Sequence, residues 1–122
     1  MNVIEIREAA KRFVAKEKRR RSLDRKRWEE ANRDARKILD HCIRSHPARI
    51  FQWGSVLHPD RFREWSDIDF ALEGLEDPGT IFRLQAECEA MTRFPVHLVE
   101  MERIEPEYAE SIRENGRVVY ER

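Results

Sequence analysis

The six residues from Asp67 to Leu72 constrain the fold of this chain more than any other stretch. Small or acidic residues alternate there with Ile68, Phe70 and Leu72. Successive side chains of a β-strand point to opposite faces, so the pattern predicts a half-buried strand with these three apolar side chains inside. Asp67 and Asp69 then share the other face. Two neighbouring carboxylates repel each other unless a cation lies between them, which indicates a Mg²⁺ site.

A second feature precedes this strand, with eleven residues between Ser55 and Asp67. Residues 50–53 predict a short buried strand, and Gly54 and Ser55 follow it. A glycine-serine turn at the start of a helix offers free backbone N–H groups and a hydroxyl, which suit phosphate oxygens. The turn and the acidic strand together predict a site for a metal-bound nucleoside triphosphate.

In order and spacing, these features resemble the nucleotidyltransferase superfamily of DNA polymerase beta. The chain's size and surrounding residues are similar to the minimal nucleotidyltransferases, which are paired with HEPN-domain toxins in bacteria and archaea. The similarity runs from about Arg49 to Tyr120 and includes residues 94–99 and the segment after Pro106. It implies an α/β fold with a small mixed sheet flanked by helices.

In this interpretation, residues 47–122 form the nucleotidyltransferase domain, and residues 1–46 are a helical extension packed on its core. The resemblance also implies roles for individual residues. Four would bind the triphosphate of the substrate ATP: Gly54, Ser55, Arg63 and Ser66. Two would act in catalysis and hold Mg²⁺ or Mn²⁺: Asp67 and Asp69. The third catalytic position, an aspartate in active relatives, is His97 in this chain.

His97 is the point at which the chain departs from the family's pattern. Loss of a carboxylate weakens a site for Mg²⁺, because imidazole prefers softer metals such as Zn²⁺. A histidine with an ordinary pKa of about 6.5 is nevertheless a competent general base near neutral pH. Altered activity and a silent site lined by an ordinary polar residue both remain open.

Three functions follow from these features. The first is transfer of AMP from ATP to a hydroxyl, which by family resemblance is a tyrosine of a partner HEPN toxin. The second is an antitoxin that binds and occludes such a toxin and retains only part of the old active site. The third is nucleic-acid binding, the least favoured, because contacts to phosphate alone carry no sequence specificity.

The first 46 residues predict two helices. One covers residues 2–21, and Ser22 can cap a second that continues to His46, where Pro47 stops it. An apolar stripe from Trp28 to Ile43 marks the buried face of the second helix. Further along the chain we expect a helix from Asp77 to about Arg93, a strand over 96–101, a helix from Pro106 to a cap at Gly116, and an edge strand over 118–120.

Charge is unevenly distributed. Residues 11–37 contain 13 Lys/Arg and five Asp/Glu, whereas the remainder contains 11 and 19. The run from Lys16 to Arg21 fits a solvated helix end, a docking surface for an acidic protein, or contacts to nucleic-acid phosphates. No aromatic residue interleaves with the run, so base stacking has little support.

With 122 residues, of which 40% are hydrophobic and 39% charged, the chain predicts one highly charged domain. Cys42 and Cys88 lack metal-binding spacing and are interpreted as buried thiols of a reducing cytosol. No stretch has the length of a membrane span. We therefore expect a soluble cytoplasmic protein, and the long stripe from Trp28 makes self-association or a stable protein partner plausible.

Overall fold

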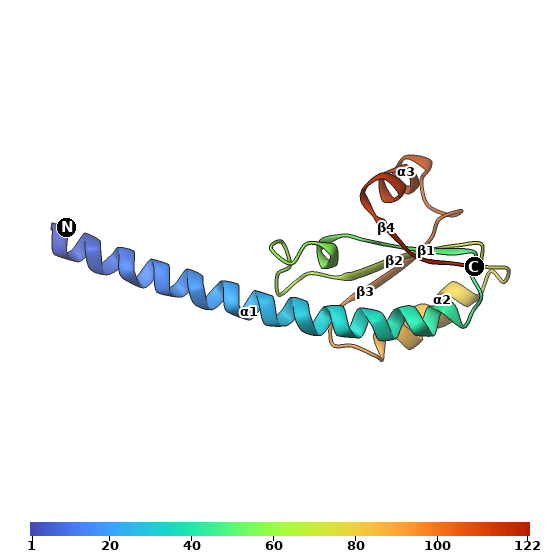
Figure 1. Cartoon of the computed structure of the whole chain (residues 1–122), viewed down its shortest axis with the longest axis horizontal. Helices are drawn as coiled ribbons and strands as arrows, with labels where there is room; N and C mark the ends of the chain where they lie inside the picture. The colour runs from blue at the N-terminus through green and yellow to red at the C-terminus, as the bar shows by residue number, and fades with distance from the viewer.

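The computed structural model describes residues 1–122 and has a mixed α/β architecture. The elements follow the chain in this order: α1 (Val3–Ile43), β1 (Arg49–Trp53), the 3₁₀ turn η1 (Ser55–Leu57), β2 (Ile68–Glu73), α2 (Thr80–Glu89), β3 (Val96–Glu100), α3 (Pro106–Asn115) and β4 (Arg117–Glu121). Figure 1 shows α1 and α2 on one side of the sheet and α3 on the other. None of the helices is both long and apolar enough to cross a membrane.

The four strands form one mixed sheet in the order β3-β2-β1-β4. Strand β1 is antiparallel to both of its neighbours, and β2 is parallel to β3. Parallel neighbours require a crossover connection, which α2 supplies between β2 and β3. The expected edge strand near the C-terminus is confirmed as β4.

Each face of the sheet has its own core. The strands contribute large apolar side chains to the first core: Ile50, Ile68, Phe70, Leu72, Val96 and Leu98. They pack against buried residues of α1 and α2, among them Ala31, Ala35, Ile38 and Leu84. The second core is smaller and joins the sheet to α3: Phe51, Ala71, Met101, Ala109 and Ile112. The alternation expected in β2 is therefore confirmed, with its three large apolar residues on the first face.

The expectation of two N-terminal helices is wrong, because α1 is one helix of 41 residues. It begins with a capping box between Asn2 and Glu5, and Ser22 lies inside it rather than at a cap. No glycine or proline occurs before Pro47 to interrupt it. Ion pairs from Arg20 to Glu17 (3.0 Å) and Asp24 (2.9 Å) also support the helix where the break was expected.

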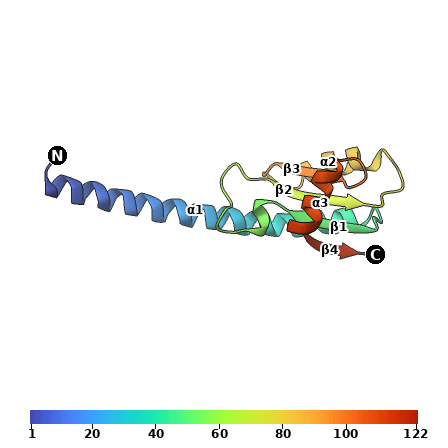
Figure 2. The ribbon, with the colours of Figure 1, turned by 90° about the horizontal axis from the view of Figure 1, so that it is seen from above.

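Only the C-terminal half of α1 packs on the sheet. All of its buried residues lie between Asp24 and Cys42. At 1.5 Å per residue the whole helix is about 60 Å long, which exceeds the sheet's width. Its N-terminal part therefore projects from the molecule as an arm, which Figures 1 and 2 show from two directions. We call residues 3–23 the arm from here on.

The boundaries of α2 also differ from expectation. The helix begins at Thr80 rather than after Asp77, because residues 76–79 form turns and the Thr80 N–H donates to the Asp77 carbonyl. It ends at Glu89 rather than near Arg93. In contrast, α3 begins with Pro106 and is followed by Gly116, as the sequence predicts.

Two cysteines join α1 to α2 in the first core. The Cys42 and Cys88 sulfurs lie 3.9 Å apart, and both side chains are fully buried free thiols. The interpretation of both residues as buried thiols is confirmed.

Candidate functional site

Gly54 places the turn after β1 directly against β2. Its φ is +84°, a conformation that residues with a Cβ rarely adopt. A Cβ built on Gly54 would collide with the Asp69 carboxylate. The glycine-serine turn and the acidic strand thus converge, as the sequence predicts. Ser55 begins η1, a single 3₁₀ turn.

Asp69 is the buried carboxylate beside the Gly54 turn. It lies on β2, is only 9% exposed and receives no hydrogen bond from the protein. Burial and, to a smaller extent, the neighbouring charge of Asp67 together raise the pKa of Asp69 to about 7. The two carboxylates are therefore close enough to repel each other, and a cation between them would relieve this repulsion.

His97 faces Asp69 from the neighbouring strand. The two residues are register partners between β3 and β2, and His97 Nδ1 lies 3.7 Å from Asp69 Oδ1. Trp53, the partner of Asp69 on β1, has its ring centroid 6.0 Å from that of His97. Adjacent strands thus place these three side chains in one row on the α3 face of the sheet. The His97 side chain is 53% exposed, so it is accessible from solvent.

A cavity of about 320 Å³ opens beside the turn, between the end of β1 and α3. The turn side of its lining comprises Trp53, Gly54, Ser55, His58 and Arg61. The α3 side comprises Tyr108, Ser111, Ile112 and Asn115. Its lining thus combines aromatic, hydroxyl, amide and guanidinium groups, which can contact both the ring and the phosphates of a nucleotide.

Sequence reasoning missed the α3 side of this cavity. Tyr108, Ser111 and Asn115 follow the helical spacing i, i+3, i+7 and share one face of α3. Tyr108 packs edge-on against Trp53, with ring centroids 6.2 Å apart. The predicted helix from Pro106 already implies that these three residues share one face. The sequence does not show that this face points towards the Gly54 turn.

Two of the expected nucleotide ligands lie elsewhere. The Ser66 hydroxyl accepts the Arg63 backbone N–H at 2.8 Å, and Ser66 is buried. Arg63 Nη1 donates to the carbonyl oxygens of Asp60 (2.9 Å) and Phe62 (3.1 Å) and lies 3.8 Å from Asp24 on α1. Ser66 therefore fixes the loop. Arg63 lines a cavity on the α1 side, and Arg61 is the arginine beside Gly54.

The structure therefore brings together Gly54, Asp69 and His97, and Asp67 lies just before β2, with its charge acting on Asp69. No set of three or more His, Cys, Asp or Glu side chains is arranged to hold a metal ion. Comparison with known proteins found no protein-family model and no curated protein that matches this chain.

Proposed function

We propose that this chain is a metal-dependent nucleotidyltransferase-like protein with a polymerase beta-like fold. It transfers a nucleoside monophosphate, AMP from ATP, to a hydroxyl of a partner protein and releases pyrophosphate. By the family resemblance, that partner is a HEPN toxin and this chain is its antitoxin. The observation that carries the proposal is the close approach of the Gly54 turn to the Asp69 carboxylate.

The residues present suit a hard divalent cation. Asp69 is a buried carboxylate without a hydrogen-bond donor, and the charge of Asp67 acts on it. Carboxylate oxygens are the ligands that Mg²⁺ prefers, and Mg²⁺ usually takes only one or two of them from the protein, with water and phosphate oxygens completing its coordination. Asp67 and Asp69 would hold the ion, which when bound neutralises charge on the phosphates during transfer.

The chain's own groups supply the remaining functions. The backbone at Gly54 and the Ser55 hydroxyl bind phosphate oxygens, and Arg61 contributes charge from the same cavity. His97, accessible and 3.7 Å from Asp69, is placed to accept the proton of the incoming hydroxyl. Trp53 and Tyr108 offer aromatic surface beside the phosphates.

The direct test is a labelling reaction. The protein is incubated with ATP carrying a labelled α-phosphate, with Mg²⁺ or Mn²⁺, and with the product of the adjacent gene. We expect label on a hydroxyl side chain of that product, and none when Asp67 is changed to Asn. No label on any acceptor, with the parent chain and either metal, contradicts transferase activity.

His97→Asp tests whether the histidine at the third catalytic position limits activity. If the missing carboxylate limits activity, His97→Asp increases labelling by about tenfold or more, the scale at which substitutions around a metal site act. His46→Asp is the matched control, because His46 is exposed and lies outside the cavity beside Gly54. If His97 is the general base, His97→Asp lowers labelling near neutral pH instead. The labelling rate then no longer rises with pH as a histidine loses its proton.

A second candidate function is occlusion of a partner without chemistry, and the arm favours it. Val3, Ile6, Phe13 and Val14 are all more than half exposed. Phe13 precedes the buried Ala31 by 18 residues, which is five turns, so this apolar stripe continues the packed face of α1 beyond the sheet. Exposed apolar side chains aligned on one helix face commonly mark a protein interface.

Protection of cells from the toxin separates the two candidates. The variant Asp67→Asn plus Asp69→Asn removes both metal-binding carboxylates and leaves the arm intact. Transfer predicts loss of protection in this variant, whereas occlusion predicts that protection persists. Phe13→Ala gives the opposite pattern, because it removes apolar surface from the arm and leaves the carboxylates in place.

A further inference from the structure

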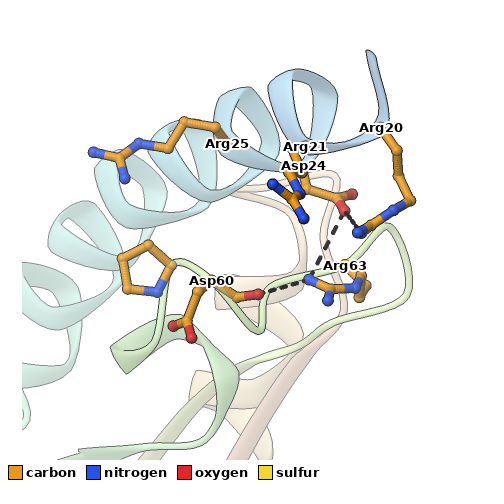
Figure 3. A pocket seen from close by; sticks show the side chains of 7 residues that line it. Arg20, Arg21, Asp24, Arg25, Asp60 and Arg63 are labelled. Atoms are coloured by element: carbon orange, nitrogen blue, oxygen red, sulfur yellow. Dashed lines mark hydrogen bonds and ion pairs between the residues drawn. The ribbon is translucent and has the colours of Figure 1, made fainter. Parts of the chain in front are cut away.

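A cavity lies between α1 and the loop before β2, away from the Gly54 turn. It measures about 580 Å³ and is lined by Arg20, Arg21, Asp24, Arg25, Pro59, Asp60 and Arg63. Figure 3 shows the three arginines of α1 opposite Asp60 and Arg63 of the loop. Four of the seven lining residues are arginines, so the cavity is suited to an anion.

Asp24 lies among these arginines, holds Arg20 by a hydrogen bond and lies close to Arg63. It is 5% exposed and accepts hydrogen bonds from Arg20 and Arg27, both at 2.9 Å, while Arg63 lies 3.8 Å away. A guanidinium group that is fixed before binding loses less conformational freedom when it contacts a ligand. The buried carboxylate therefore preorganises this cluster around the cavity.

Enough positive charge remains for a ligand. Arg21 is exposed and has no partner within the chain, and Arg63 uses only Nη1 in its contacts. Lys11 and Lys18 extend this positive charge along the arm, because the spacing i, i+7, i+10 and i+14 places them on the face of α1 that carries Arg21 and Arg25. Together they form a basic track that leads to the cavity.

Trp65 adds an aromatic surface at the same place. Its side chain is 75% exposed, and it lines a second cavity of about 300 Å³. This second cavity shares Arg20, Asp24 and Arg63 with the first. Within the sequence no aromatic residue interleaves with the basic run, but the fold brings Trp65 to it from the loop.

We propose that this surface binds single-stranded nucleic acid, with phosphates in the arginine cavity and along the arm and with a base stacked on Trp65. Exposed aromatic rings beside basic grooves are the common means of binding single strands. The basic track beyond the cavity favours a strand with several phosphates over a mononucleotide. The binding site is separate from Asp67 and Asp69 and does not depend on nucleotidyl transfer.

The test measures the fluorescence anisotropy of a labelled single-stranded RNA of about 12 nucleotides, a length within the usual range of such sites. We expect saturable binding that weakens steeply between about 50 and 200 mM salt. Arg21→Ala is expected to reduce the slope of log K against log salt by about 0.7, the value for one phosphate contact to a single strand. Trp65→Ala is expected to weaken binding about tenfold at fixed salt without changing that slope.

Two matched variants serve as controls. Arg33 is an exposed arginine on the same helix, outside the arm and about 18 Å from Arg21. Phe82 on α2 is 74% exposed, close to the exposure of Trp65. Arg33→Ala and Phe82→Ala are expected to bind as the parent does. All four replaced side chains are exposed, and circular dichroism verifies that the variants fold.

Competition with unlabelled molecules identifies which kind of phosphate-containing ligand the surface binds. Unlabelled single-stranded RNA is expected to displace the label far more effectively than UMP, tripolyphosphate or a duplex of equal length. Displacement by tripolyphosphate at equal phosphate concentration contradicts the base contact. Absence of binding at about 50 mM salt, or equal binding by the Trp65→Ala and Phe82→Ala variants, overturns the proposal.

Discussion

Gly54 meets two constraints that only glycine satisfies together. Its φ of +84° lies in the region that favours glycine, and a Cβ there would collide with Asp69. The atom that such a Cβ would meet is Oδ2 of Asp69, so any larger residue would have to displace this carboxylate as well as adopt a strained backbone. The identity of residue 54 is therefore fixed by the close approach of turn and carboxylate.

Gly54→Ala is expected to lower the free energy of unfolding by about 2 kcal/mol or more, since strained backbone and steric overlap add. Gly79→Ala is the control, because residue 79 has φ −79° and a Cβ there meets nothing within 4 Å. The control is expected to change stability by less than about 1 kcal/mol, with stabilisation the expected sign. Urea denaturation of both variants measures the difference, and equal effects would show that Gly54 is not constrained as described.

Asp69 gives the protein an unusual dependence of stability on pH. Its pKa is raised from 3.8 to about 7 in the folded chain. Between these values the folded state holds a proton that the unfolded state has released, so stability falls as pH rises through this window. The cost is fully present above about pH 7 and absent below about pH 4.

Asp69→Asn removes this cost and is expected to be more stable than the parent at about pH 8, by at most about 4 kcal/mol. The difference is expected to vanish towards about pH 4. Asp40→Asn, at an exposed position of α1, is the control and is expected to show no such trend. Thermal unfolding across this range checks the sign, and a parent that gains stability with rising pH relative to Asp69→Asn contradicts the assignment.

A cation bound by Asp67 and Asp69 would offset the same cost. Mg²⁺ is therefore expected to raise the melting temperature of the parent near about pH 8 and to leave the melting temperature of Asp69→Asn unchanged. The comparison reports on the metal alone and needs no acceptor.

At the scale of elements, α1 combines a structural half with a projecting half. Ile38 is fully buried against the sheet, whereas Phe13 on the arm is 67% exposed. The same helix face thus continues from the core into solvent. Stability therefore depends on one segment of this element, and the proposed partner binding on the other.

Ile38→Ala is expected to destabilise the chain by about 2–5 kcal/mol, because it removes a buried side chain and leaves a cavity. Phe13→Ala is expected to change the free energy of unfolding by less than about 0.5 kcal/mol, as surface substitutions usually do. Both replace an apolar residue of α1 with the same side chain, so denaturation separates packing from helix propensity. A large effect of Phe13→Ala would show that the arm is packed in the free protein.

Some elements were predicted correctly because the pattern that indicates each of them lies within a short stretch of sequence. The alternation of β2 and the proline and glycine around α3 were sufficient, because each depends on neighbours along the chain. The break at Ser22 was wrong because a serine can cap a helix but does not end one, and the charges around it pair along α1. The boundaries of α2 depended on turns at residues 76–79 that periodicity does not reveal.

At the scale of the whole molecule, sequence spacing placed the Gly54 turn and Asp69 together but could not place Arg63 or Trp65. Gly54 directly follows Trp53, the partner of Asp69 on β1, so the proximity of the turn and Asp69 follows from the sheet. The other two belong to a loop whose course depends on contacts with α1, such as that of Arg63 with Asp24. The sequence therefore did not reveal the orientation of Arg63 or the position of Trp65 beside the run from Lys16 to Arg21.

Because α1 is one continuous helix, its packing on the sheet fixes the direction in which the arginines of the arm point. Each residue added or removed between Arg25 and Trp28 would turn the arm by about 100° and shift it by about 1.5 Å. One such change would carry Arg20 and Arg21 away from the loop. Seven residues would restore their direction to within about 20° but shift them by about 10 Å along the helix axis. The number of residues between the packed stretch and the arginines therefore fixes both the direction in which they point and their position beside the loop.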